Sequence, residues 1–197
     1  MAGKQSNNDP TQTELAPGFT VADYEAACNA KDRERIADAL RSRFTSRYIE
    51  PVTSGKGKPT HGFTVMAIAC LMIESLETFR QGWENSDGKS KAAFCYFFDR
   101  QILFSDFRGY SAQFYKNVRC GILHQAETTG GWKITRKRGA PLLEGGPSPA
   151  INATLFLRHL RSVLDEFCDE LRTADWNDIE WKNVRTKMKA LCNNCRP

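Results

Sequence analysis

The feature that most constrains the fold is a long apolar stretch covering residues 63–83. It is apolar on nearly every side until Glu74, which predicts a helix at the centre of a bundle. Its longest unbroken apolar run, Val65 to Ile73, has nine residues, whereas a helix that crosses a bilayer needs about 20. We therefore expect a core helix and no membrane contact.

Helical patterns also precede this stretch. Thr20 and Asp32 are residue types that cap helices, and each precedes a segment with helical character. From Ile36 to Tyr48, apolar residues recur every four positions, as one helical face requires. We expect Pro51 to end this helix.

Further helices are predicted after the central stretch. The segments are a short helix over 89–98, one over 111–126 with Phe114, Val118 and Ile122 on one face, a long one over 152–173 and a short one from Asp175. The fold class is therefore all-α. We expect a disordered tail over residues 1–18 and a single helical domain over 19–197.

A different pattern interrupts the helices at about residues 130–145. Gly130 and Gly131 are followed by Trp132 and Ile134 in alternation, and Gly139 provides a turn signal. This predicts a small β-hairpin insertion. Trp132 and Ile134 should point to one side of it, because side chains alternate along a strand.

Composition bears on where the protein acts in the cell and on whether it binds a metal or cofactor. The first 18 residues hold one lysine and no apolar core, unlike a secretory signal, so we expect a cytoplasmic protein with its seven cysteines reduced. Cys192 and Cys195 form a C-x-x-C pair, but no second pair follows to complete a zinc site. We expect no metal and no cofactor.

Most catalytic signatures are missing from the sequence. It has no Gly-rich phosphate loop, no H-E-x-x-H and no nucleophile elbow. Among its three histidines, His124 stands out, because four residues separate it from Arg119 within one predicted helix.

This R-x4-H spacing resembles the signature of the HEPN superfamily, helical proteins that include many ribonucleases. The order of an apolar helix with an internal acid, the motif, a Gly-Gly-Trp segment and a long amphipathic helix is also similar, over roughly residues 60–172. The resemblance implies a HEPN-like bundle and a homodimer in which both motifs line one cleft. One departure is Cys120, since catalytic families usually carry a polar residue directly after the arginine.

Arg119 and His124 would suffice for RNA cleavage without a metal. Histidine can take a proton from the 2′-OH near neutral pH, and a guanidinium can hold two oxygens of the charged phosphorane. Asn117 and Glu74 are possible supports. The alternative is structural, with Arg119 paired to a buried Glu74 or Glu77 and His124 merely packed.

A basic run follows the motif, which favours RNA as a partner. Lys133, Arg136, Lys137 and Arg138 lie within a short stretch without an acid, so they could hold a phosphate backbone while Trp132 stacks a base. A solvated hairpin tip is the alternative for this run.

Two functions remain open from the sequence. One is a metal-independent RNA endonuclease, or RNA-binding relative, of the defence or toxin type, with an antitoxin or other partner protein. The other is a non-catalytic helical module that binds a protein or a nucleotide. Cys120 favours the module, and the basic run favours the nuclease.

Overall fold

The computed structural model of the protein describes residues 9–53 and 61–196. The chain is mostly helical, which confirms the expected fold class. The α-helices are α1 Val21–Ala30, α2 Arg33–Phe44, α3 Glu50–Thr53, α4 Gly62–Gln81, α5 Ser90–Arg100, α6 Ser111–Phe114, α7 Cys120–Gln125, α8 Ala153–Thr173 and α9 Ile179–Asn194. The strands are β1 Glu14–Ala16, β2 Phe19–Thr20, β3 Lys133–Thr135, β4 Leu143–Glu144 and β5 Ala150–Asn152.

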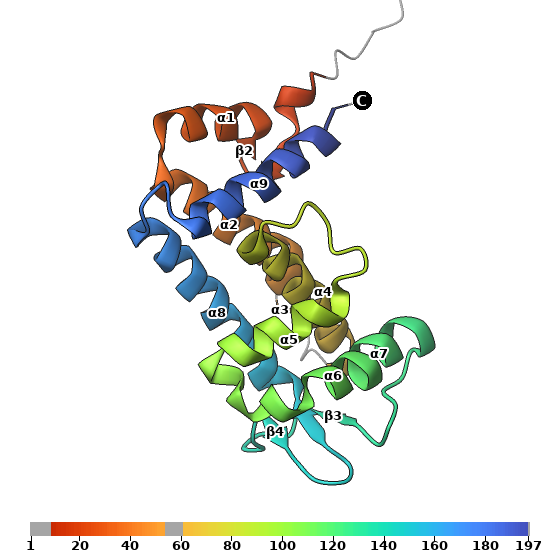
Figure 1. The fold of residues 1–197 in the computed structure, drawn as a ribbon. Coiled ribbons are helices and arrows are strands. Elements are labelled where there is room, and N and C mark those ends of the chain that lie inside the picture. Colours follow the sequence, from red (N-terminus) through yellow and green to blue (C-terminus); the bar gives the residue numbers. More distant parts are fainter. Residues whose placement is uncertain (1–8, 54–60, 197) are drawn as a thin grey trace, which may run out of the picture.

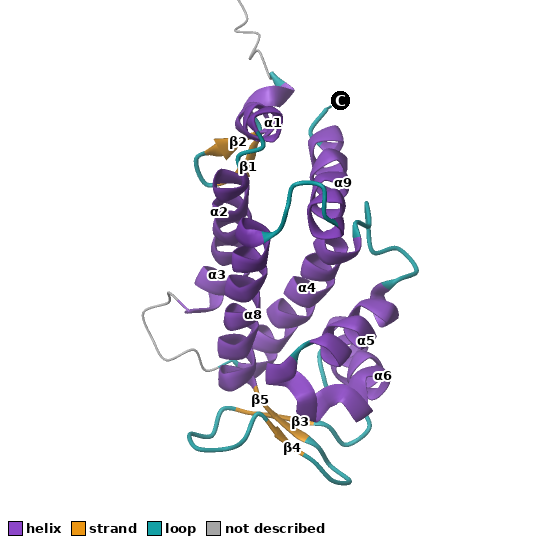
Figure 2. Cartoon of the chain, turned by 60° about the vertical axis from the view of Figure 1, so that its left-hand side comes forward, coloured by secondary structure: helices purple, strands orange, loops and turns teal. Residues whose placement is uncertain are grey.

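Helix α4 is the centre of the bundle, as its apolar sequence predicts. It packs against α5, α8 and α9, while α2 packs on the other side of α8. Figures 1 and 2 show α1 and the β1–β2 pair at one end of the molecule, and β3, β4 and β5 at the other. By length and composition alone α4 could cross a membrane, but most of it is buried among these helices.

A cluster of phenylalanines joins α5, α6 and α8 into one core. Phe98 stacks on Phe107 with ring centroids 4.9 Å apart, and Phe114 stacks on Phe156 at 5.7 Å. All four rings are fully buried. Burying one such side chain contributes about 1.5–3 kcal/mol, so this cluster fixes where α6 and the following turns lie.

The N-terminal segment differs from the expected tail. Residues 10–12 form a 3₁₀ turn and β1 pairs with β2, with Leu15 and Ala16 buried. Arg43 donates a hydrogen bond to the carbonyl oxygen of Leu15 and so ties the strand to α2. The prediction of disorder is therefore wrong for residues 9–18, because two apolar side chains find a place in the core. Residues 1–8 lie outside the described residues.

The predicted helix starts are confirmed. Thr20 and Asp23 form a reciprocal capping box at α1, and the Asp32 side chain accepts from the backbone N–H of Arg35 at the start of α2. Pro51 does not end the helical run. A π-helical segment over Thr45–Ile49 shifts the hydrogen-bond register, which leaves Pro51 in the first turn of α3, where proline is tolerated.

The predicted hairpin is also wrong in its pairing. The strand order is β3-β5-β4, with β3 parallel and β4 antiparallel to β5. The tight antiparallel connection therefore lies between β4 and β5, and residues 136–142 form a loop. Asn152 holds that loop, since its side-chain amide donates to the carbonyl oxygens of Lys137 and Ala140 while its oxygen caps α8.

The C-terminal helix is longer than predicted. It begins at Ile179, after a turn that starts at Asp175, and continues to Asn194. Trp181 is fully buried in it, with its indole N–H donating to the carbonyl oxygen of Leu171. Cys192 is also buried, so the C-x-x-C pair lies at the end of this helix, with Cys195 at its C-cap.

Candidate functional site

The R-x4-H motif lies on a continuous helical segment from Ser111 to Gln125, which confirms the predicted helix. Its middle, Tyr115–Arg119, is π-helical, and Ala126 ends it in the left-handed conformation. The segment contacts α4, with Phe114 and Val118 fully buried and Ile122 half-buried. A π turn is rare and frequently marks a functional position, and this one ends at Arg119.

Arg119 is held by a buried carboxylate of the central helix. Its Nε donates to Oε1 of Glu74 at 2.6 Å, with side-chain exposures of 16% for the arginine and 9% for the glutamate. Burial disfavours the charge of Arg119, but the ion pair outweighs it, so the pKa of Arg119 lies above its ordinary value. Of the two acids considered from the sequence, Glu74 is therefore the partner.

Two thiols and a phenol surround this pair, namely Cys70, Cys120 and Tyr115. Burial raises the pKa of Cys70, and Glu74 adds to that shift. Burial and a hydrogen bond to Cys120 likewise raise the pKa of Tyr115, whose ring lies 5.6 Å from the Arg119 guanidinium carbon. Cys120 approaches Arg119 Nη1 only at 4.0 Å, so Glu74 is the one carboxylate that pairs with Arg119 among the described residues.

His124 has a different environment from Arg119. It is exposed in the last turn of α7. Its side chain forms no hydrogen bond or ion pair with any residue of 9–53 or 61–196. Five residues turn through about 140° on a helix, so the two side chains point away from a common face. The structure thus places these two described residues on one helical segment, with no hydrogen bond between their side chains.

Asn117 supports a loop rather than Arg119. Its backbone and side-chain oxygens accept from the N–H and hydroxyl of Thr129, at 2.9 and 3.0 Å. Gly121 lies under the same return loop, where a Cβ would be 2.5 Å from the Glu127 carbonyl oxygen. Asn117 and Gly121 therefore fix the chain between the motif and β3.

The proposed base-stacking role of Trp132 is wrong. The residue is only 4% exposed, and its ring packs edge-to-face on Tyr110 at 5.8 Å and on Phe114 at 6.1 Å. The indole completes the aromatic core, which is stabilised by burial of its large apolar area. The buried ring is therefore not accessible to a base.

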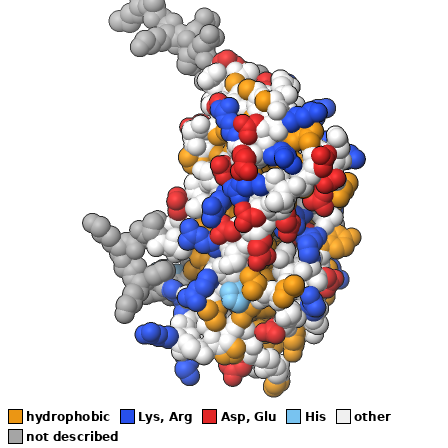
Figure 3. Space-filling model, turned by 90° about the vertical axis from the view of Figure 1, so that its left-hand side faces the viewer, with side chains coloured by type: hydrophobic (Ala, Val, Ile, Leu, Met, Phe, Trp, Pro, Cys, Tyr) orange, Lys and Arg blue, Asp and Glu red, His pale blue; other side chains and the backbone are white. Residues whose placement is uncertain are grey.

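The basic run lies on β3 and the loop after it. Lys133, Lys137 and Arg138 are exposed, whereas Arg136 is half-buried and donates through Nε to the Thr154 hydroxyl at 3.0 Å. Figure 3 shows basic and acidic side chains mixed over the upper and middle parts of one face, and basic ones with few acids along its lower left edge. The run is therefore available to an anionic partner, but not as a hairpin tip.

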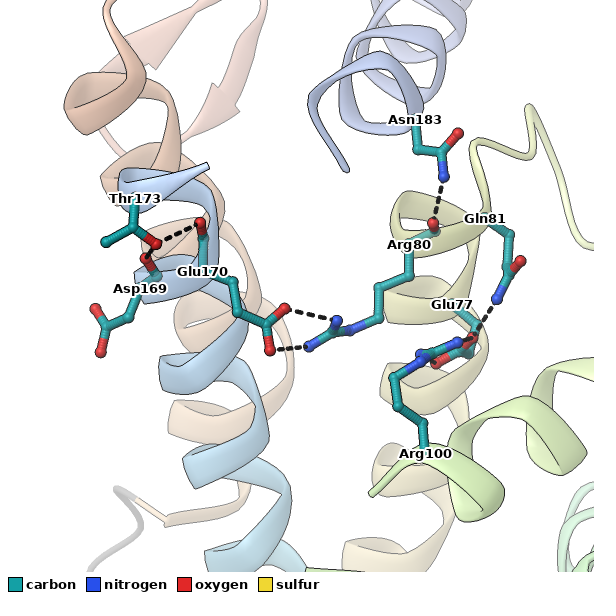
Figure 4. Close-up of polar contacts among 8 residues, drawn as sticks. All are labelled: Glu77, Arg80, Gln81, Arg100, Asp169, Glu170, Thr173 and Asn183. Carbon is teal, nitrogen blue, oxygen red and sulfur yellow. Dashed lines mark hydrogen bonds and ion pairs between the residues drawn. The ribbon is translucent and has the colours of Figure 1, made fainter. Parts of the chain in front are cut away.

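A second ion-pair system lies on α4. The sequence shows its charged residues, but no pattern in it predicts their pairing. Glu77 is fully buried and receives both Nη groups of Arg100, at 2.7 and 3.3 Å, and the side-chain amide of Gln81. Figure 4 shows these contacts beside the pair of Arg80 with Glu170. Every charge in this system has a partner, which is typical of a structural network.

Metal ligands are not gathered in the described part of the chain. No group of three or more His, Cys, Asp or Glu side chains there could hold a metal ion. Burial raises the pKa of the Cys192 thiol to about 11, which disfavours the thiolate that zinc requires.

Comparison with known proteins adds no relative. The chain matches no protein-family model, no curated protein and no solved structure.

Proposed function

We propose that this protein is a HEPN-like RNA endonuclease that works without a metal, with Arg119 and His124 in its site. The observation that supports this most is the contrast between the two side chains. Glu74 holds Arg119 in a fixed, partly exposed position at a π turn, while His124 on the same helix is exposed and has no side-chain partner among the described residues. One residue is fixed and the other is accessible, as anion binding and proton transfer respectively require.

In the proposed reaction His124 accepts the proton of the ribose 2′-OH. The 2′-oxygen then forms a bond to phosphorus, and the bond from phosphorus to the 5′-oxygen breaks. Water donates a proton to that leaving oxygen and His124 releases its own proton to solvent, so the products are a 2′,3′-cyclic phosphate and a 5′-OH. Arg119 keeps its charge throughout and stabilises the phosphorane through its Nη groups.

A homodimer would bring the missing second set of groups to the site. Leu71 and Leu123 are 41% and 37% exposed, and each lies one helical turn from a member of the Glu74–Arg119 pair. Covering these leucines by a second copy would bury apolar surface beside both motifs. The proposed setting is a cytoplasmic defence or toxin system in which a partner protein restrains the nuclease.

A second candidate is a non-catalytic module that binds a protein or a nucleotide. The ion pair itself favours it, because Glu74 already compensates the charge that would stabilise a phosphorane. Cys120 in place of a polar residue points the same way.

RNA cleavage in EDTA, followed by end-group analysis, separates the two candidates. His124→Ala should lower the rate by about 10²–10⁴-fold with little change in melting temperature, because this side chain is exposed. Arg119→Lys should be similarly impaired, since an ammonium cannot reproduce the guanidinium fork.

Arg108→Gln is a suitable control, because Arg108 is exposed outside the motif and the basic run. It should cleave like the wild type. Full activity of His124→Ala would remove this residue from the mechanism. A wild-type protein that is dimeric but inert on RNA would favour the binding module.

A further inference from the structure

A cavity separate from the motif lies between the start of α8, the end of the α2–α3 run and the loop after β3. Its volume is about 320 Å³, within the range of small-molecule sites. Three arginines line it, namely Arg136, Arg158 and Arg161.

These three arginines have no carboxylate partner in the described part of the chain. No aspartate or glutamate lines the cavity, and no ion pair engages the three guanidinium groups among the described residues. By contrast, Arg41 and Arg172, on the neighbouring surface of α2 and α8, are each paired with a carboxylate. The hydrogen bond from Arg136 Nε to the Thr154 hydroxyl fixes one of the three.

The remaining lining is mostly apolar. Ile49, Val52, Val65 and Leu157 contribute side chains from four different elements. Three arginine side chains, of which Arg158 and Arg161 are exposed on α8, therefore border the same apolar wall. A ligand that satisfies both must carry a compact, multiply charged anion attached to an apolar body.

We propose that this cavity binds a phosphate monoester with an apolar or aromatic body. A phosphate monoester carries nearly two negative charges at neutral pH, and its oxygens match the guanidinium fork. An internal RNA phosphodiester carries a single charge and needs no apolar wall. The site is thus distinct from the proposed cleavage site, and its occupancy does not depend on His124.

Isothermal titration calorimetry with phenyl phosphate tests this directly on the full chain. Phenyl phosphate should bind at least about tenfold more tightly than inorganic phosphate, phenol or methyl phenyl phosphate, since each lacks the apolar body or part of the charge. The double variant Arg158→Gln/Arg161→Gln should weaken binding by at least about tenfold, because each lost charged hydrogen bond has a comparable effect.

Two matched variants make the result specific. Arg108→Gln/Lys182→Gln removes the same charge from exposed positions outside the cavity and should bind like the wild type, as should His124→Ala. Melting curves with and without phenyl phosphate confirm that each variant is folded and show its ligand-induced stabilisation. Absent binding, equal affinity for inorganic phosphate, or equal losses in both double variants would overturn the proposal.

Discussion

Two glutamates on α4, one helical turn apart, pair with arginines from different helices in different ways. Glu77 is fully buried and both of its oxygens receive guanidinium hydrogen bonds, while Arg100 extends toward solvent at 36% exposure. Glu74 binds Arg119 through Nε alone, and both side chains retain some exposure. The first pair is saturated, whereas in the second no carboxylate of the described residues binds the Nη groups of Arg119.

This difference separates a structural ion pair from a candidate functional one. A buried carboxylate requires compensation, and the Arg100 fork supplies it completely. At Glu74 the compensation fixes the arginine but leaves donors that a phosphate could use. The comparison makes predictions that differ between the two pairs.

The largest expected effect is loss of stability when the saturated pair is broken. Arg100→Ala should lower the free energy of unfolding by about 3 kcal/mol, because Glu77 would stay buried without its cation. Denaturant unfolding measures this change. The double variant Glu77→Leu/Arg100→Leu should recover much of the loss, and a change below about 1 kcal/mol in Arg100→Ala would remove the distinction from Glu74.

Breaking the Glu74–Arg119 pair should reduce stability less, and RNA cleavage more, than breaking the Glu77–Arg100 pair. We expect Arg119→Ala to lower the unfolding free energy by about 2 kcal/mol, since Glu74 keeps partial access to water. RNA cleavage per folded molecule should nevertheless disappear in Arg119→Ala and persist in Arg100→Ala. Equal cleavage by both variants would contradict the functional assignment of Arg119.

A steric change beside Arg119 should have a smaller effect confined to the motif. Gly121→Ala places a Cβ against the Glu127 carbonyl oxygen and should destabilise the protein by about 1–2 kcal/mol through overpacking. Amide hydrogen exchange should rise in residues 126–132 and stay unchanged around Arg100. A uniform rise over both regions would show that the two pairs are not separable.

The smallest expected effect is on pH dependence. The folded pKa of Arg119 lies above its ordinary value, so its contribution to stability is fully present below the unfolded pKa and is lost only as pH rises past the folded pKa. The stability difference between wild type and Arg119→Gln should therefore be equal at about pH 6 and about pH 9. Thermal melting at the two pH values measures this difference. A marked change in the stability difference across this range would show that another titrating group controls the pair.

Much of the helical framework follows from the sequence alone. The capping residues Thr20 and Asp32, the apolar stretch of α4 and the motif helix all depend on contacts within a few residues, so local patterns predict them. The same locality explains the errors. The helix continues through Pro51 because a π turn precedes it. Leu15 is ordered because its side chain packs into a core built from distant parts of the chain.

Tertiary packing alone decided what surrounds the candidate sites. The sequence left Glu74 and Glu77 equivalent as partners of Arg119, placed Trp132 on a surface and gave no sign that Arg136 would meet Arg158 and Arg161. Each of these outcomes depends on how far-apart segments approach one another: β3 pairs with β5 rather than β4, and the indole fills the aromatic core. The sequence determined which chemical groups this protein carries, but their partners depend on long-range packing, because burial and pairing arise only when the segments come together.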